Sequence, residues 1–154
     1  MTERIKLIKP YISFDEVADD LKEIFDSGQL TKGRHVDKFV AGLKDYTAAE
    51  YAFLTTSATT ALTMSLKAID VKAGDKVAVS DFSWPATCNV VEDLGATPVF
   101  IDVDRLTFNM CPIDLEKKLD TSFAGVIVVD ALGNPSGIRQ LKEICYSHSR
   151  PKTR

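Results

Sequence analysis

Hydroxyl side chains cluster where an apolar run gives way to a helical pattern. In LTTSATTALTMSLKAI, residues 54–69, the first turn of the expected helix contains Ser57, Ala58 and Thr59. The leading amides of a helix lack partners within it, and the helix dipole favours an anion at that end. These residues could bind a phosphate group without a lysine, although the pattern also fits a serine, Ser57, or a threonine, Thr56, that merely caps the helix. The sequence contains neither GxxxxGKS/T nor GxGxxG, so neither a P-loop nor an ordinary dinucleotide fingerprint is indicated.

The only tryptophan, Trp84, is the second residue with chemical potential. It lies in DFSWPATCN, after an expected strand and before Pro85, a residue that suits the first turn of a helix. An indole held there could stack on a flat ring, or it could fill the core. Asn89, further along the same expected helix, is a candidate polar contact and equally fits a surface amide.

The remaining reactive residue types indicate no metal centre and no catalytic triad. The aspartates of the DVD motif, residues 102–104, are typical of a loop that caps its own backbone. His35 and His148 are each isolated in the sequence, as surface or packed core histidines usually are. The cysteines have no ligand spacing and are odd in number, so they indicate small buried thiols; they are Cys88, Cys111 and Cys145.

Two amphipathic helices are predicted before any strand. The first lies in SFDEVADDLKEIFDSGQ, residues 13–29, with Ser13 and Glu16 spaced as a capping box and Gly28 ending the helix. The second lies in HVDKFVAGLKDY, residues 35–46, whose apolar residues share one face. We therefore expect residues 1–50 to form an amino-terminal helical arm.

From residue 51 the pattern changes to short apolar runs separated by helix-length segments, which predicts a mainly parallel sheet with flanking helices. Four strands are expected: YAFLT (51–55), KVAVS (76–80), TPVFIDV (97–103) and AGVIVV (124–129). Helices are expected after Ser57 and within residues 85–95, 112–120 and 136–148. In such a sheet, ligands gather beyond the carboxyl ends of the strands.

Size and charge narrow the class of protein. The chain has 154 residues, a formal charge of −3 and 45% hydrophobic residues, as expected of one soluble globular domain. There is no broad basic surface for nucleic acid or an anionic membrane, and no apolar run long enough to span a bilayer. We therefore expect a cytoplasmic protein in which a local site meets any anionic ligand.

In order and spacing, the motifs resemble those of the DegT-type sugar aminotransferases. These are pyridoxal-phosphate (PLP) enzymes of the aspartate-aminotransferase fold (fold type I) that act on nucleotide-linked keto sugars. The resemblance runs from about Lys9 to Ser149 and includes SGQLTKGRHVDKF, TTSATTAL, GDKVAVSDFSWPATCNVV, LGATPVFIDVD and LGNPSGI. It implies the following cofactor contacts: Ala58 and Thr59 hold the PLP phosphate, Ser57 shapes the turn, Trp84 stacks on the pyridine, and Asn89 matches a frequent polar residue.

The resemblance also implies that residues 51–154 are an incomplete PLP-binding α/β domain, the first half of the PLP-transferase large domain. Family members continue to an aspartate that pairs with the pyridinium nitrogen and to the lysine that carries PLP. This chain ends at SHSRPKTR, and none of its lysines falls in a matching motif. We therefore expect an amino-terminal fragment without catalytic residues of its own, inactive alone and prone to associate because the sheet edges are uncovered.

The resemblance implies transfer of an amino group from glutamate or glutamine to a nucleotide-linked keto sugar. The product would be an amino sugar for surface polysaccharide or secondary metabolite assembly, and the full-length enzyme would be a homodimer. Two alternatives stay open. One is a PLP-dependent sugar dehydratase of the same family, in which histidine replaces the lysine. The other is a non-catalytic PLP-fold remnant or interaction module.

Overall fold

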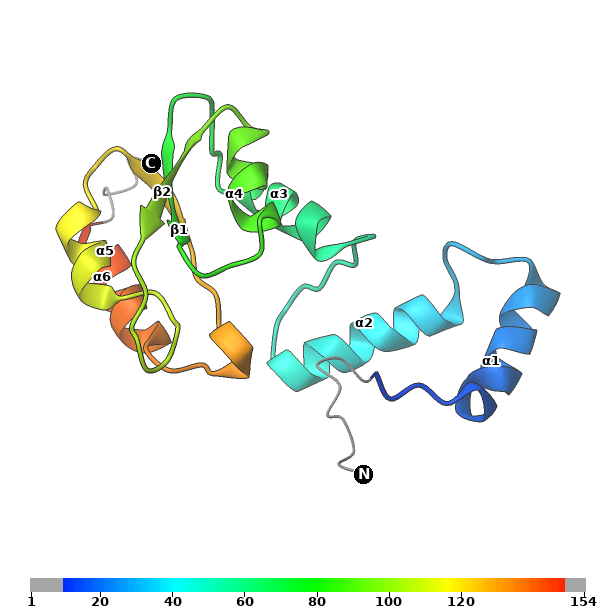
Figure 1. Cartoon of the computed structure of the whole chain (residues 1–154). Coiled ribbons are helices and arrows are strands. Elements are labelled where there is room, and N and C mark those ends of the chain that lie inside the picture. The colour runs from blue at the N-terminus through cyan, green and yellow to red at the C-terminus, as the bar shows by residue number, and fades with distance from the viewer. Residues whose placement is uncertain (1–9, 149–154) are drawn as a thin grey trace. The chain divides into compact units, whose positions relative to one another are not determined.

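The computed structural model describes residues 10–148. The chain divides into two compact units, Met1–Leu54 and Thr55–Arg154 (Figure 1). In the described part of the chain, the regular secondary structure of the first unit consists of helices, and the second unit contains the sheet. All residues predicted to contact the cofactor belong to the second unit.

The first unit consists of α1 (Phe14–Ser27) and α2 (Arg34–Thr47), as predicted. Gly28 ends α1 in the left-handed conformation with φ 68°, which glycine adopts without steric cost. The predicted capping box is wrong, because the Ser13 side chain makes no capping hydrogen bond. The Glu16 carboxylate instead accepts a hydrogen bond from the Tyr11 hydroxyl at 3.3 Å.

The second unit contains a three-stranded parallel sheet in the order β2-β1-β3. Its strands are β1 (Lys76–Ser80), β2 (Thr97–Ile101) and β3 (Phe123–Ile127). Figure 1 shows α3 (Ala58–Ala68) and α4 (Ala86–Glu92) on one side of the sheet. On the other side are α5 (Pro112–Lys118) and α6 (Ile138–His148), and a short 3₁₀ turn, η1 (Ala131–Gly133), follows β3.

The alternation of side chains along β1 divides the core into two layers. Val77 and Val79 pack in a buried cluster with residues of α3 and α4, including Leu66 and Val90. Ala78 points to the opposite face and belongs to a second buried cluster, which contains residues of β2, α5 and α6. The central strand is thus buried on both faces, as is typical of a parallel sheet covered by helices.

The predicted first strand, residues 51–55, is wrong because the segment has no regular secondary structure. A strand exists only where a neighbour pairs with its amides and carbonyls, and no described strand pairs with this segment. Tyr51 and Phe53 are exposed, at 69% and 82%. The segment is therefore apolar, but it lacks the pairing that would make it a strand.

The other three predicted strands are confirmed, although β2 and β3 each end two residues earlier than expected and β3 begins one residue earlier. The fold class, a partial parallel sheet with flanking helices, is confirmed as well. Among residues 10–148, no helix is both long and apolar enough to cross a membrane.

Candidate functional site

The carboxyl edge of the sheet gathers the segments that follow all three strands, because the strands are parallel. The start of α3 belongs to the same edge. A short turn connects the end of α3 to the beginning of β1, so α3 runs antiparallel to β1 and begins where β1 ends (Figure 1). The start of α4 also lies there, and α3 and α4 pack against each other.

The first turn of α3 combines a capped amide with two unpaired ones. Ser57 has extended backbone angles, and its hydroxyl oxygen accepts the Thr60 amide hydrogen bond at 3.1 Å. The amides of Ala58 and Thr59 have no acceptor within residues 10–148. The first turn contains no acidic side chain, so nothing in it repels an anion. Two exposed donors at the positive end of a helix can hold a phosphate oxygen.

Trp84 is 79% exposed, so the alternative that it fills the core is wrong. Its backbone is nevertheless fixed, because its carbonyl accepts the Thr87 amide hydrogen bond at 2.9 Å as α4 begins. The Ser83 and Thr87 hydroxyls, 2.6 Å apart, tie the loop to the helix. The indole therefore projects from an ordered loop and presents its faces for stacking.

Asn89 lies on the exposed side of α4. Its side-chain oxygen accepts a weak hydrogen bond from the Cys88 thiol at 3.5 Å. Nothing in this arrangement distinguishes a cofactor contact from a helix-surface amide, so its role stays a prediction.

A buried asparagine connects two loops of this edge. Asn109, only 3% exposed, follows β2, and its side-chain oxygen accepts the Ala131 amide hydrogen bond at 2.8 Å. Its side-chain nitrogen donates to the carbonyls of Asn134 at 2.7 Å and Ser136 at 2.9 Å. The loop after β3, which carries the LGNPSG sequence, is thereby fixed to the loop after β2.

The loops after β1 and β2 also meet through aromatic rings. Phe82 and Phe108 have ring centroids 5.3 Å apart with planes tilted by 42°. Phe108 has φ 60°, an unfavourable angle for a residue with a side chain, and its amide donates to the Asp104 carbonyl. Together with Asn109, this contact ties the three carboxyl-edge loops into one connected framework.

The DVD aspartates cap their own loop, as predicted. The Asp104 carboxylate accepts hydrogen bonds from the amides of Leu106 and Thr107, and these lower the pKa of Asp104. Asp102 accepts from the Val103 amide at 2.7 Å. The carboxylates are thus engaged by local amides rather than gathered as acid and base.

The predicted contacts in Ser57, Ala58, Thr59 and Trp84 lie on segments that meet at one edge of the sheet. The start of α3 offers two amides without acceptors, and the loop after β1 offers an exposed indole. Sequence reasoning missed Asn109, because no local pattern distinguishes an asparagine that bonds to residues more than 20 positions away. It also missed Phe108, which is an ordinary residue in the sequence.

A model of the DegT/DnrJ/EryC1/StrS aminotransferase family matches residues 13–151. The chain belongs to this family. The match covers both helices of the first unit and all three strands of the second. The resemblance carried by the sequence motifs is therefore confirmed at the level of the family.

Solved structures give the same fold. The chain is 29% identical to an aminotransferase from Psychrobacter cryohalolentis, with a TM-score of 0.84 over 91% of this chain and 36% of that one. Spr1654 from Streptococcus pneumoniae is assigned as a sugar aminotransferase and was solved in its PLP form. The chain is 27% identical to it, with a TM-score of 0.85 over 96% of this chain and 39% of that one. An E. coli GDP-4-keto-6-deoxy-D-mannose-3-dehydratase with bound hydrated PLP, at 22% identity and a TM-score of 0.80 over 90% and 37%, shares the fold. The chain thus spans little more than a third of the length of these proteins.

Proposed function

We propose that this chain is the cofactor-positioning, amino-terminal part of a PLP-dependent aminotransferase. The reaction would transfer an amino group from glutamate or glutamine to a nucleotide-linked keto sugar. One observation carries the cofactor assignment: two unpaired amides at the start of α3 share the carboxyl edge of the sheet with the exposed indole of Trp84. Family membership supports the class of reaction.

Each residue has a distinct task in this proposal. The Ala58 and Thr59 amides donate to the cofactor phosphate, while the Ser57 hydroxyl keeps the turn in place by accepting from Thr60. The Trp84 indole stacks on the pyridine ring, and Asn89 offers a polar contact beside it. When bound, PLP supplies the electron sink that amino transfer requires.

The 154 residues alone are proposed to position the cofactor without catalysing transfer. In this proposal, none of their lysines is the family lysine to which PLP is attached. The full-length enzyme is proposed to be a cytoplasmic homodimer that produces amino sugars for polysaccharide or secondary metabolite assembly. These finer assignments rest on the family resemblance.

The binding test uses pyridoxamine 5′-phosphate, because PLP itself would react with surface lysines through its aldehyde. We expect saturable quenching of fluorescence, which reports directly on stacking because Trp84 is the only tryptophan. Pyridoxamine without the phosphate should bind at least about tenfold more weakly, since it loses charge-assisted hydrogen bonds. Equal affinity for the two compounds would contradict the role of the α3 amides.

Two variants separate the phosphate turn from the ring contact. Ala58→Pro removes one amide donor at a position where the helix tolerates proline, and the extended backbone of Ser57 already suits a following proline. It should weaken pyridoxamine 5′-phosphate binding about tenfold or more while leaving helix content intact. Trp84→Ala should weaken binding, measured by equilibrium dialysis, about two- to tenfold, and Trp84→Phe should weaken it less.

Activity assays distinguish the remaining readings. Mixing the chain with glutamate or glutamine, PLP and a nucleotide-linked keto sugar should yield no amino sugar. Formation of an amino sugar would show that the chain is active by itself and would refute this part of the proposal. If the chain yields no amino sugar and does not bind pyridoxamine 5′-phosphate, a non-catalytic remnant or interaction module becomes the better interpretation. The dehydratase alternative differs at the residue in place of the lysine, and no feature of residues 10–148 favours it.

A further inference from the structure

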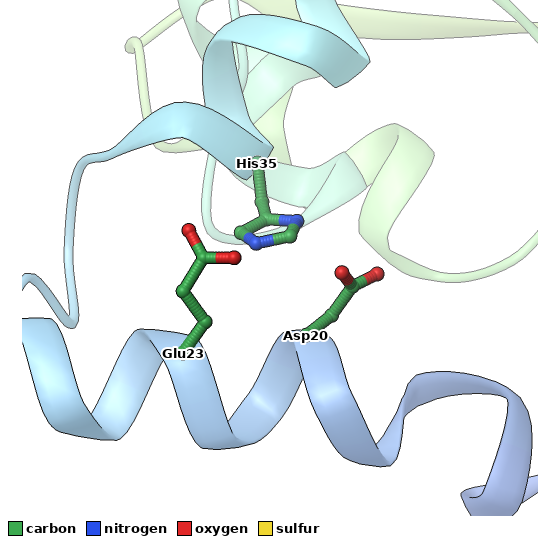
Figure 2. A group of neighbouring side chains, drawn as sticks. All are labelled: Asp20, Glu23 and His35. Carbon is green, nitrogen blue, oxygen red and sulfur yellow. The ribbon is translucent and has the colours of Figure 1, made fainter.

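The first unit contains a cluster of metal-ligand types that the sequence does not reveal. Asp20 and Glu23 lie three residues apart in α1, so they share one helix face. The loop after Gly28 returns the chain so that the first turn of α2 places His35 beside them (Figure 2). One ligand atom from each of the three side chains lies within 4.8 Å of the other two.

His35 provides the independent observation that this cluster needs. The residue is half-buried, its Nε2 atom is inaccessible to solvent, and this nitrogen has no hydrogen-bond partner among the described residues. Buried polar atoms without a partner are rare in folded proteins, and a bound ion is one of the few ways to satisfy them. Figure 2 shows the imidazole directed into the space between the two carboxylates.

We propose that Asp20, Glu23 and His35 form a binding site for a divalent transition-metal ion such as Zn²⁺. One imidazole nitrogen and two carboxylate oxygens suit Zn²⁺ or Co²⁺, whereas Mg²⁺ and Ca²⁺ prefer oxygen ligands alone. The ligands of a tetrahedral Zn²⁺ ion lie about 3.4 Å apart, so small rotations of the two exposed carboxylates complete the site. Water fills the fourth position.

The surroundings of the cluster set its affinity. A cavity of about 120 Å³ borders the cluster and is lined in part by Glu23, Arg34 and His35, although not by Asp20. Arg34 forms an ion pair with one oxygen of Glu23 and therefore competes with a cation. A metal ion that displaces Arg34 would cross-link α1 to α2 and stabilise this helical pair.

The decisive measurement follows the histidines directly, because the chain contains only two of them. We titrate the 154-residue chain with Zn²⁺ and follow the two imidazole resonances by NMR, assigned with His148→Gln. We expect saturable shifts of the His35 resonance only, because among the described residues His148 belongs to no group of three possible metal ligands. Absence of shifts, or equal shifts of both resonances, would overturn the proposal.

Variants then test each ligand. Calorimetry with Zn²⁺ should show about a tenfold or greater loss of affinity in Asp20→Asn and in His35→Gln. The matched controls Asp19→Asn and His148→Gln should remain within twofold of the wild type, about the precision of calorimetry, because neither residue is in the cluster. Arg34→Gln should bind Zn²⁺ more tightly, because it frees Glu23. Retained affinity in His35→Gln, or weaker binding in Arg34→Gln, would contradict the site.

The three cysteines are an alternative source of metal binding, and Co²⁺ distinguishes them. Cobalt bound by thiolates gives an intense charge-transfer absorption, which a site of one imidazole and two carboxylates lacks. We expect weak visible absorption that saturates with the His35 shift. Thiolate absorption in the wild type that persists in His35→Gln would show that Cys88, Cys111 or Cys145 binds the ion instead.

Discussion

Replacing Asn109 with alanine tests whether the buried side chain holds the loops of the carboxyl edge together. The substitution removes an acceptor from the Ala131 amide and a donor from the carbonyls of Asn134 and Ser136. Ala131 is itself buried, at 3% exposed, so its amide cannot turn to water. The two carbonyls lie in the partly buried loop, where solvent can replace part of the lost bonding.

The expected magnitude follows from these environments. An unsatisfied buried amide costs about 1–3 kcal/mol, and each of the two carbonyl hydrogen bonds contributes about 1 kcal/mol net. Asn109→Ala should therefore lower the free energy of unfolding by about 3–5 kcal/mol. For a unit of this size, each kcal/mol lowers the midpoint of thermal unfolding by about 4–8 °C. A large part of the stability of a small domain would be lost.

The assay is urea unfolding followed by far-ultraviolet circular dichroism. Tryptophan fluorescence is unsuitable, because Trp84 is already exposed in the folded state and changes little on unfolding. Asn89→Ala is the matched control, because Asn89 lies exposed on α4 and accepts only a weak bond from Cys88. Asn109→Asp keeps the acceptor for Ala131 but places an oxygen against two carbonyls, so it should also destabilise the protein.

The result that would refute this reasoning is a free energy of unfolding for Asn109→Ala within about 1 kcal/mol of the control. Such an outcome would mean that the loop after β3 finds other partners. It would also remove Asn109 from the framework that positions the edge. A loss of stability in Asn109→Ala without any loss in Asn109→Asp would limit the argument to the Ala131 amide.

Three further predictions concern stability. Gly95→Ala should destabilise the protein by about 1–3 kcal/mol, because φ is 72° and the new Cβ would lie 3.0 Å from the Cβ of Ala73. Gly42→Ala meets nothing within 4 Å inside α2 and should stabilise that helix by up to about 1 kcal/mol in the same thermal unfolding assay. Lys118 and the Asp102 amide lower the pKa of Asp114, so its contribution is present above the unfolded-state pKa and lost as pH falls through the folded-state pKa. The stability difference between wild type and Asp114→Asn should therefore shrink between about pH 5 and pH 2, and a difference that grows on acidification would contradict this sign.

The spacing of apolar residues and the positions of turn residues predicted most of the regular secondary structure. The helices of the first unit follow from apolar residues on one face, and Gly28 ends α1 through its left-handed backbone. Three strands follow from short apolar runs between turn residues. The strand predicted at residues 51–55 was wrong, because a strand depends on a pairing partner as well as on its own residues. Hydrophobicity alone cannot supply that partner.

The parts of the site that resisted prediction depend on contacts between distant residues. The Asn109 side chain forms hydrogen bonds with residues 22–27 positions later in the chain. The sequence around Asn109 contains no pattern that predicts these partners. His35 seemed isolated because its neighbours Asp20 and Glu23 belong to the preceding helix. Their spacing predicts a shared face, but only the path of the intervening loop decides whether a histidine reaches it.

At the start of α3, helix capping and anion binding are compatible interpretations of the same motif. From the sequence, Ser57 either capped a helix or belonged to a phosphate site. In the structure its hydroxyl accepts the Thr60 amide, which fixes the turn in the geometry of a capped helix. This bond occupies the serine oxygen as an acceptor for Thr60, and the amides of Ala58 and Thr59 stay available as donors. Capping therefore does not argue against anion binding here, because a rigid first turn aims the free amides at one place and reduces the entropy lost when the anion binds.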